Sequence, residues 1–198
     1  MQYNGKKYNK RNGKNAGRGH IPNRVCIEKR PEVVAAKDRI GDWELDTVIG
    51  CRGPGVIVSM VDRASKLTKL AIVPTKHAYG ISKAIIDKLI STHSVVHTLT
   101  ADNGKEFANH TQVSTALGAS FYFANPYHSW ERGLNEHTNG LIRQYFPKGK
   151  SLKGVTQEDL DLVESLLNNR PRKVLKYFTP IEVFQRLNSA TDNVALGN

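Results

Sequence analysis

The order of strand-like and helix-like segments before residue 124 constrains the fold of this chain more than any other feature. Polar and apolar side chains alternate through residues 40–49, a period of two that predicts a strand with one acidic face. Apolar runs joined by short turns predict further strands, and apolar side chains at helical spacing predict a helix. The expected strands span residues 40–49, 55–61, 67–73 and 95–100, and the expected helix spans residues 81–92. Since crossovers are almost always right-handed, the fourth strand should lie parallel to the first.

The remainder of the chain extends this α/β pattern. We expect a fifth strand over residues 119–123 and helices over residues 109–117, 130–145, 157–168 and 180–187. Gly133 should break the helix expected over residues 130–145 or delay its start. The prediction is a five-stranded mixed sheet, with three antiparallel strands and then two parallel strands, flanked by helices. A chain of 198 residues can form one domain of roughly 150 residues. The expected organisation is a basic arm over residues 1–30, a core over 31–190 and a tail over 191–198.

Positive charge is concentrated in residues 1–30. The chain carries a formal net charge of +11, and residues 1–30 contain nine Lys/Arg and one Glu, which leaves +3 for the other 168 residues. This segment has few apolar residues, so we expect a mobile arm. Lys6, Lys7 and Arg11 are expected to contact phosphates of a polyanion, which gives salt-sensitive binding. The alternative is a solubilising linker.

The sequence argues against several other classes of protein. Cys26 and Cys51 form no pair with metal-ligand spacing, and the seven histidines lack cysteine partners, so we expect no structural zinc. No apolar run approaches the roughly 20 residues that span a bilayer, and no secretory signal is apparent. We expect a cytoplasmic protein with no membrane partner.

Three acidic residues have contexts that favour chemistry over solvation: Asp46 in GDWELDTVIG, Asp102 in TLTADNGKEF and Glu136 in ERGLNEHTNG. Asp46 is expected in the buried part of its strand, and Asp102 just beyond the end of the fourth strand. Three carboxylates at one point can hold two divalent cations, which suits phosphodiester chemistry. Taken singly, each has a plain alternative: an ion-paired strand acid, a turn aspartate and a solvated helix glutamate. Glu44 shares a face with Asp46 and is the nearest competitor.

Five motifs carry a resemblance to a known family. They are DTVIG, TADNGKEFANH, GLNEHTNGLIRQYFPKG, LNNRPRK and TPIEVF. In order and spacing they resemble the catalytic region of bacterial DDE transposases, most closely the insertion sequence thirty family, over about residues 20–187. The resemblance implies the retroviral-integrase variety of the ribonuclease H-like fold. It also implies that Asp46, Asp102 and Glu136 hold two Mg²⁺ or Mn²⁺ ions.

Five residues near these acids are expected to contact DNA: Lys105, Arg132, Asn135, Asn139 and Arg143. The arginines lie one turn before and two turns after Glu136, so they can share its helix face. An intrahelical ion pair is the alternative for Arg143, helix capping for the asparagines, and a solvated turn lysine for Lys105.

The expected function is metal-dependent cleavage and strand transfer of DNA by a transposase catalytic domain that assembles as a homo-oligomer on DNA. Rival functions are an inactive DNA-binding remnant, a ribonuclease H-like nuclease and a protein-interaction module. Leu45 and His137 depart from the family pattern, and so does the pair His128-Ser129. No pair of amphipathic helices precedes residue 30, so we expect weak recognition of element ends.

Overall fold

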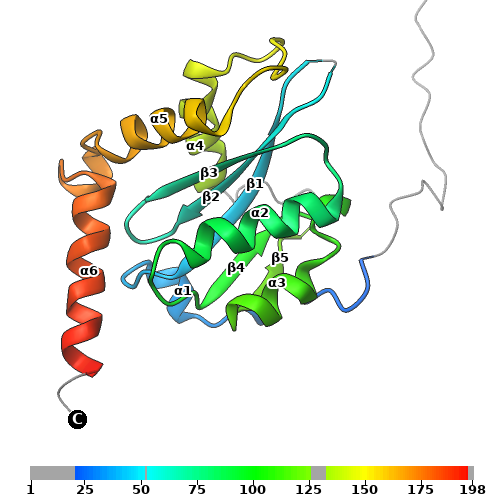
Figure 1. Ribbon diagram of the computed structural model, residues 1–198. Coiled ribbons are helices and arrows are strands. Elements are labelled where there is room, and N and C mark those ends of the chain that lie inside the picture. The colour runs from blue at the N-terminus through cyan, green and yellow to red at the C-terminus, as the bar shows by residue number, and fades with distance from the viewer. Residues whose placement is uncertain (1–20, 52, 126–132, 196–198) are drawn as a thin grey trace, which may run out of the picture.

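A five-stranded sheet forms the centre of the computed structural model, which describes residues 21–51, 53–125 and 133–195, with side chains up to Ser189. The strands are β1 Asp42–Ile49, β2 Val56–Asp62, β3 Thr68–Val73, β4 Thr98–Ala101 and β5 Ser120–Phe123. Their order in the sheet is β3-β2-β1-β4-β5 (Figure 1). The pairs β1–β2 and β2–β3 are antiparallel, whereas β1–β4 and β4–β5 are parallel. The predicted mixed sheet is therefore confirmed.

Six α-helices surround the described part of the sheet. They are α1 Val33–Ala36, α2 Ala78–Ile90, α3 His110–Leu117, α4 Gly133–Tyr145, α5 Gln157–Asn168 and α6 Pro180–Ala195. Short 3-10 turns are η1 Ile27–Lys29, η2 Lys105–Phe107 and η4 Lys173–Leu175. Thr156 and Asp159 form a reciprocal capping box that fixes the start of α5 at its expected residue. α6 extends well past residue 187, the expected end, and continues through residue 190, where we had placed a domain boundary.

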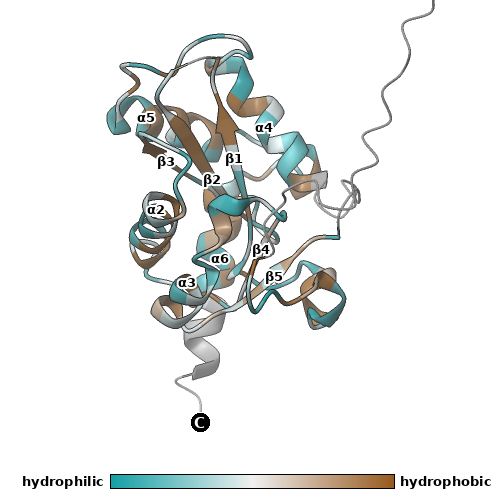
Figure 2. Cartoon of the chain, turned by 90° about the vertical axis from the view of Figure 1, so that its right-hand side faces the viewer, coloured by the Kyte–Doolittle hydropathy of each residue, from teal (hydrophilic) through white to brown (hydrophobic). Residues whose placement is uncertain are grey.

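Each face of the sheet packs on its own apolar layer. Leu45 and Trp43 belong to the larger cluster, which includes residues of α2 and α3. Val48 belongs to the second cluster, with residues of α4 and α5. Figure 2 shows the apolar strands between helices α2 and α4. Successive side chains of a strand point to opposite faces, so Asp46 lies on the α4 side of the sheet with Val48.

Side chains of α5 cover the open edge of β3. Asn168 accepts from Thr68 N–H (2.9 Å) and donates to Thr68 C=O (2.8 Å). The Glu164 carboxylate accepts from the N–H of Leu70 (2.8 Å). Gln157 donates to Leu70 C=O and accepts from Ile72 N–H, at 3.0 and 3.1 Å. These side chains occupy the hydrogen-bonding positions of an additional strand, which protects the edge from pairing with another chain.

The described part of the expected arm is not free. Val25 C=O accepts from Phe123 N–H (2.9 Å), and Cys26 forms a parallel bridge with Phe123. Ile21 is buried in the larger core, and Arg30 donates to Thr100 Oγ1 (3.1 Å). The prediction of a mobile arm through residue 30 is thus wrong for residues 21–30, which lie along the outer edge of β5. Residues 1–20 lie outside the described part.

Among the described helices, none combines the length and the apolar character needed to cross a membrane.

Candidate active site

Three acids line the α4 side of β1, and they differ in their partners. Asp42 accepts from Arg39 Nε (2.8 Å) and from Thr98 Oγ1 (2.7 Å). Glu44 is buried and pairs with Arg63; burial raises the pKa of Glu44, and the charge of Arg63 opposes that rise. Asp46, which we expected in the buried part of its strand, is instead the most exposed of the three. The other two acids are used in folding, whereas Asp46 remains within reach of solvent and ligands.

Strand register brings Asp46 and Asp102 together. β1 and β4 are parallel, with Glu44 aligned with Thr100. The pairing ends at Glu44 and Thr100, and Asp46 and Asp102 each lie two residues beyond that pair; Asp102 follows the last residue of β4. Adjacent strands are about 4.8 Å apart, and aligned residues point to the same face. The parallel orientation of β1 and β4 confirms the prediction from the right-handed crossover.

The loop after Asp102 is held by its own hydrogen bonds. Asp102 Oδ1 accepts from Gly104 N–H (2.9 Å), and Asn103 donates to Ala124 C=O (2.5 Å) and accepts from Arg24. A Cβ at Gly104 would lie 2.3 Å from Glu106 Oε2, so a larger residue there would displace the Glu106 carboxylate. The turn thus fixes Asp102 at the end of the sheet.

Glu106 is a buried acid that the sequence reading missed. Its carboxylate accepts from Thr47 Oγ1 (3.1 Å) and pairs with Lys76 Nζ at 2.6 Å. Thr47 follows Asp46 on β1, so its side chain lies on the opposite face of the sheet. Nothing in the KEF sequence distinguishes a buried glutamate from a solvated one; only the fold brings Lys76 to it.

Helix α4 is fixed to β1 by two asparagines that flank the third acid. Asn135 Nδ2 donates to Leu45 C=O (3.1 Å), and Asn139 Nδ2 donates to Asp46 Oδ2 (2.8 Å). Glu136 is exposed in the first turn of α4. Residues three apart on a helix are neighbours, roughly 5–6 Å between their Cβ atoms. Glu136 therefore lies one turn from the side chain that contacts Asp46.

The donor set around Asp46 suits hard divalent cations, because carboxylate and amide oxygens are the ligands such cations prefer. Asn139 Oδ1 is buried, with no hydrogen-bond partner in the described structure, so it is a further oxygen beside Asp46. The described side chains nevertheless include no group of three or more His, Cys, Asp or Glu that could hold a metal ion. Asp46 and Asp102 are aligned by the strands, whereas Glu136 is not gathered with them into such a group.

Of the remaining predicted site residues, two lie in described elements and four lie outside the described residues. Lys105 is exposed at the start of η2. Arg143 donates to Ile49 C=O (2.8 Å) and Phe146 C=O (3.4 Å), which ties the last turn of α4 to the end of β1. Arg132, Lys6, Lys7 and Arg11 lie outside the described residues, as does the pair His128-Ser129.

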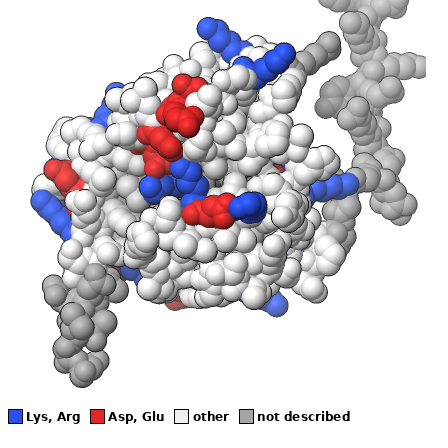
Figure 3. Space-filling model, in the orientation of Figure 1, with Lys and Arg blue, Asp and Glu red and all other residues white. Residues whose placement is uncertain are grey.

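The face that carries α2 and α5 shows acidic and basic atoms side by side (Figure 3). Ion pairs on these elements include Lys83 with Asp87 (2.6 Å) and Lys88 with Asp161 (2.8 Å). Positive charge here is matched by acids, so this face does not form a continuous basic surface for a polyanion.

Known proteins resemble this chain in both sequence and fold. The transposase for insertion sequence element IS4351 of Bacteroides fragilis is 49% identical over 187 residues, which cover 94% of this chain and 57% of that protein. The transposase InsI for element IS30A of Escherichia coli (strain K12) is 41% identical over 174 residues, 87% of this chain and 45% of that protein. No protein-family profile matches the chain.

A solved structure with the same fold is the catalytic core domain of BIV integrase. It superposes with a TM-score of 0.58 at 20% identity, over 76% of this chain and 97% of that domain. This likeness confirms the predicted ribonuclease H-like architecture. The chain spans about half the length of the two curated transposases. The chain is therefore a homologue of insertion-sequence transposases of the IS30 family, and it has the fold of an integrase catalytic core.

Proposed function

We propose that this chain is the catalytic region of a DNA transposase, which cleaves a phosphodiester at an element end and joins the resulting 3′ hydroxyl to target DNA. The proposal rests on one feature: β1 and β4 are parallel with Glu44 opposite Thr100, Asp46 and Asp102 each follow that pair by two residues, and Asn139 of α4 contacts the Asp46 carboxylate. The transposase relatives and the net charge of +11 support DNA as the substrate.

Asp46, Asp102 and Glu136 would hold the divalent cations, which we propose to be two Mg²⁺ or Mn²⁺ ions. When bound, such cations help to deprotonate the attacking water or hydroxyl and stabilise charge on the leaving oxygen. Because the described side chains form no complete metal-binding group, we propose that Glu136 joins the two aspartates when cations and DNA are present.

The other residues of the site act by positioning. Asn139 orients the carboxylate of Asp46 by donating to Oδ2, and Asn135 and Arg143 hold α4 on β1 through the carbonyls of Leu45 and Ile49. Both chemical steps are in-line displacements at phosphorus, so one rigid site can serve both. Transposition joins two DNA ends, so we propose that the protein works as a homo-oligomer on DNA.

Strand-transfer assays with Mn²⁺ and a pre-cut DNA end test the proposal. Asp102→Asn and Glu136→Gln should each lower the joining rate more than about 100-fold, since even residues that only support metal ligands cost roughly 10- to 100-fold. Asp87→Asn is the matched control, because this exposed aspartate of α2 pairs with Lys83 of the same helix and belongs to no part of the candidate site. EDTA should abolish joining.

Two results would overturn the assignment. Joining by Asp102→Asn at the parental rate would exclude the acid from catalysis. Salt-dependent DNA binding by the parental chain, with no joining in either metal, would favour the inactive-remnant alternative.

A further inference from the structure

A cavity of about 310 Å³ lies beside α4, and three of its seven described lining residues are Lys or Arg. Its described lining is Lys37, Lys66, Leu134, His137, Thr138, Arg172 and Val174. Small-molecule sites have volumes of roughly 300–1,000 Å³, so this cavity can take a single charged group together with water.

The cations come from three places far apart in the sequence. Lys37 follows α1, Lys66 lies in the turn between β2 and β3, and Arg172 precedes η4. Lys37 and Lys66 both adopt left-handed backbone conformations, with φ of 58° and 63°. Such conformations are uncommon for residues with long side chains. The fold therefore gathers these charges despite a backbone cost.

No acid is among the described residues that line the cavity. Burial, and then the charge of Lys37, lowers the pKa of Lys66. Burial, and then Arg170, lowers the pKa of Arg172. Two acids act on Lys66: Asp62, whose carboxylate already accepts from Gly41, Ala64 and Ser65, and Glu44, which pairs with Arg63. The Lys66 ammonium also donates to Arg63 C=O. Lys37 and Lys66 thus repel one another, and an anion in the cavity would relieve that repulsion.

Arg172 also has an unused donor. Its Nη2 donates to Leu167 C=O (3.0 Å), whereas its buried Nε has no hydrogen-bond partner in the described structure. A guanidinium donates readily to phosphate oxygens, and lysine ammonium groups add charge without fixing one geometry.

The position of the cavity on α4 relates it to the candidate active site. Asn135 and Asn139 face β1, whereas Leu134, His137 and Thr138 line the cavity. At 100° per residue, Glu136 and the cavity lie on opposite flanks of the helix, with Gly140 on the exposed surface between them. A Cβ at Gly140 would meet no atom within 4 Å, so this surface is open to a strand crossing the helix.

We propose that the cavity binds one backbone phosphate of the DNA strand that crosses α4. The bound phosphate would lie on the opposite flank of α4 from the scissile phosphate, on the strand that crosses the helix. The proposal rests on the proposed function for the identity of the polymer, but it needs neither cations nor catalysis.

A scan of neutral methylphosphonate substitutions tests the site. Binding of short duplexes is measured by fluorescence anisotropy in EDTA, with one phosphate neutralised at a time. One position should weaken binding to the parental chain, and Arg172→Gln and Lys37→Gln should each remove the effect of that position. Each variant should also lower the slope of log affinity against log salt by up to about 0.9, the value for one phosphate. Lys83→Gln, which removes a cation from α2, should change neither.

Lys37 is exposed, so its variant keeps the test valid if Arg172→Gln fails to fold. Equal phosphate scans for the parental chain and both variants would overturn the proposal. Calorimetric titration with inorganic phosphate tests whether the cavity takes a free phosphate rather than a DNA phosphate. Saturable phosphate binding that depends on Arg172, together with no effect of any methylphosphonate position in DNA, would make free phosphate the ligand and would also overturn the proposal. The strand-transfer assay fails or succeeds independently, because these measurements contain no metal.

Discussion

Asn168→Ala is expected to destabilise the protein by about 2–3 kcal/mol. Asn168 is 5% exposed and bonds both backbone groups of Thr68, a residue that is 1% exposed on the edge strand β3. Removal of the amide leaves a buried N–H and a buried C=O without partners, at about 1–3 kcal/mol each. The two unpaired groups together could cost up to about 6 kcal/mol, but water that reaches them lowers this cost.

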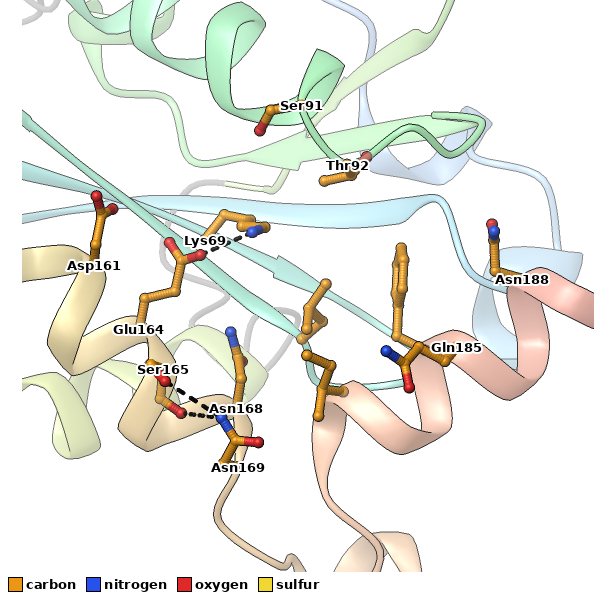
Figure 4. A pocket seen from close by; sticks show the side chains of 13 residues that line it. Lys69, Ser91, Thr92, Asp161, Glu164, Ser165, Asn168, Asn169, Gln185 and Asn188 are labelled. Carbon is orange, nitrogen blue, oxygen red and sulfur yellow. Dashed lines mark hydrogen bonds and ion pairs between the residues drawn. The ribbon is translucent and has the colours of Figure 1, made fainter.

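Water can reach the gap because Asn168 lines an open cavity of about 450 Å³ between α5, α6 and the end of α2. Figure 4 shows Asn168 on α5 beside Glu164, whose carboxylate pairs with Lys69. Two polar groups facing such a cavity can each bind a water molecule, which recovers part of the lost hydrogen bonding. This is why we place the cost near the lower end of the range.

Urea unfolding measures the effect. With a slope of roughly 2 kcal/mol per molar urea, the midpoint should fall by about 1 M or more while the slope stays unchanged. Asn169→Ala is the matched control: its exposed side chain donates to Ser165 C=O at 2.9 Å, and its loss should cost no more than about 0.5 kcal/mol. Equal midpoints for the two variants would refute the argument that α5 closes the edge of the sheet.

Two further perturbations separate stability from function. Gly140→Ala and Gly80→Ala each add a methyl group that meets nothing within 4 Å, so each should stabilise its helix by up to about 1 kcal/mol in thermal unfolding. Only Gly140→Ala should slow strand transfer. Equal strand-transfer rates for the two variants would argue against DNA contact at α4. Lys66→Met should stabilise the protein more near pH 8 than at pH 10.5 in urea titrations. The pKa of Lys66 is lowered in the folded state by burial and Lys37, so the unfolded chain alone gains a proton as pH falls below 10.5; a gain that does not change with pH would contradict this.

The sheet could be predicted because its signals are local. Alternation of side chains located β1, and the handedness of the crossover then placed β4 parallel to it, which aligned Asp46 with Asp102. The path of residues 21–30 could not be predicted in this way. That segment docks through the backbone of Val25 and through scattered side chains such as Ile21 and Arg30, and such contacts show no periodic pattern in the sequence.

The sequence also does not show which residues pair with the buried acids. Residues 42–46 show three acids with the same period, so alternation alone does not separate them; the motif DTVIG selected Asp46 but did not reveal the partners of the other two. The fold pairs Glu44 with Arg63 from the turn after β2, whereas Asp46 accepts from the amide of Asn139 and from Thr47 N–H. A buried carboxylate beside a guanidinium is held as a structural ion pair, whereas one beside an amide can still accept a cation. The distinction comes from residues that are distant in the sequence.

Leu45 and His137, the two residues beside the acids that differ from the family pattern, do not point toward the three acids. Leu45 is fully buried in the apolar layer with α2, on the face of β1 opposite Asp46, and its carbonyl is what Asn135 contacts. Any residue at position 45 supplies that carbonyl, so leucine changes the packing behind the site rather than the site. His137 lies on the cavity flank of α4, away from the flank that contacts Asp46. Its effect should therefore appear in the affinity for the DNA strand and its salt dependence, while cation binding by the three acids stays unchanged.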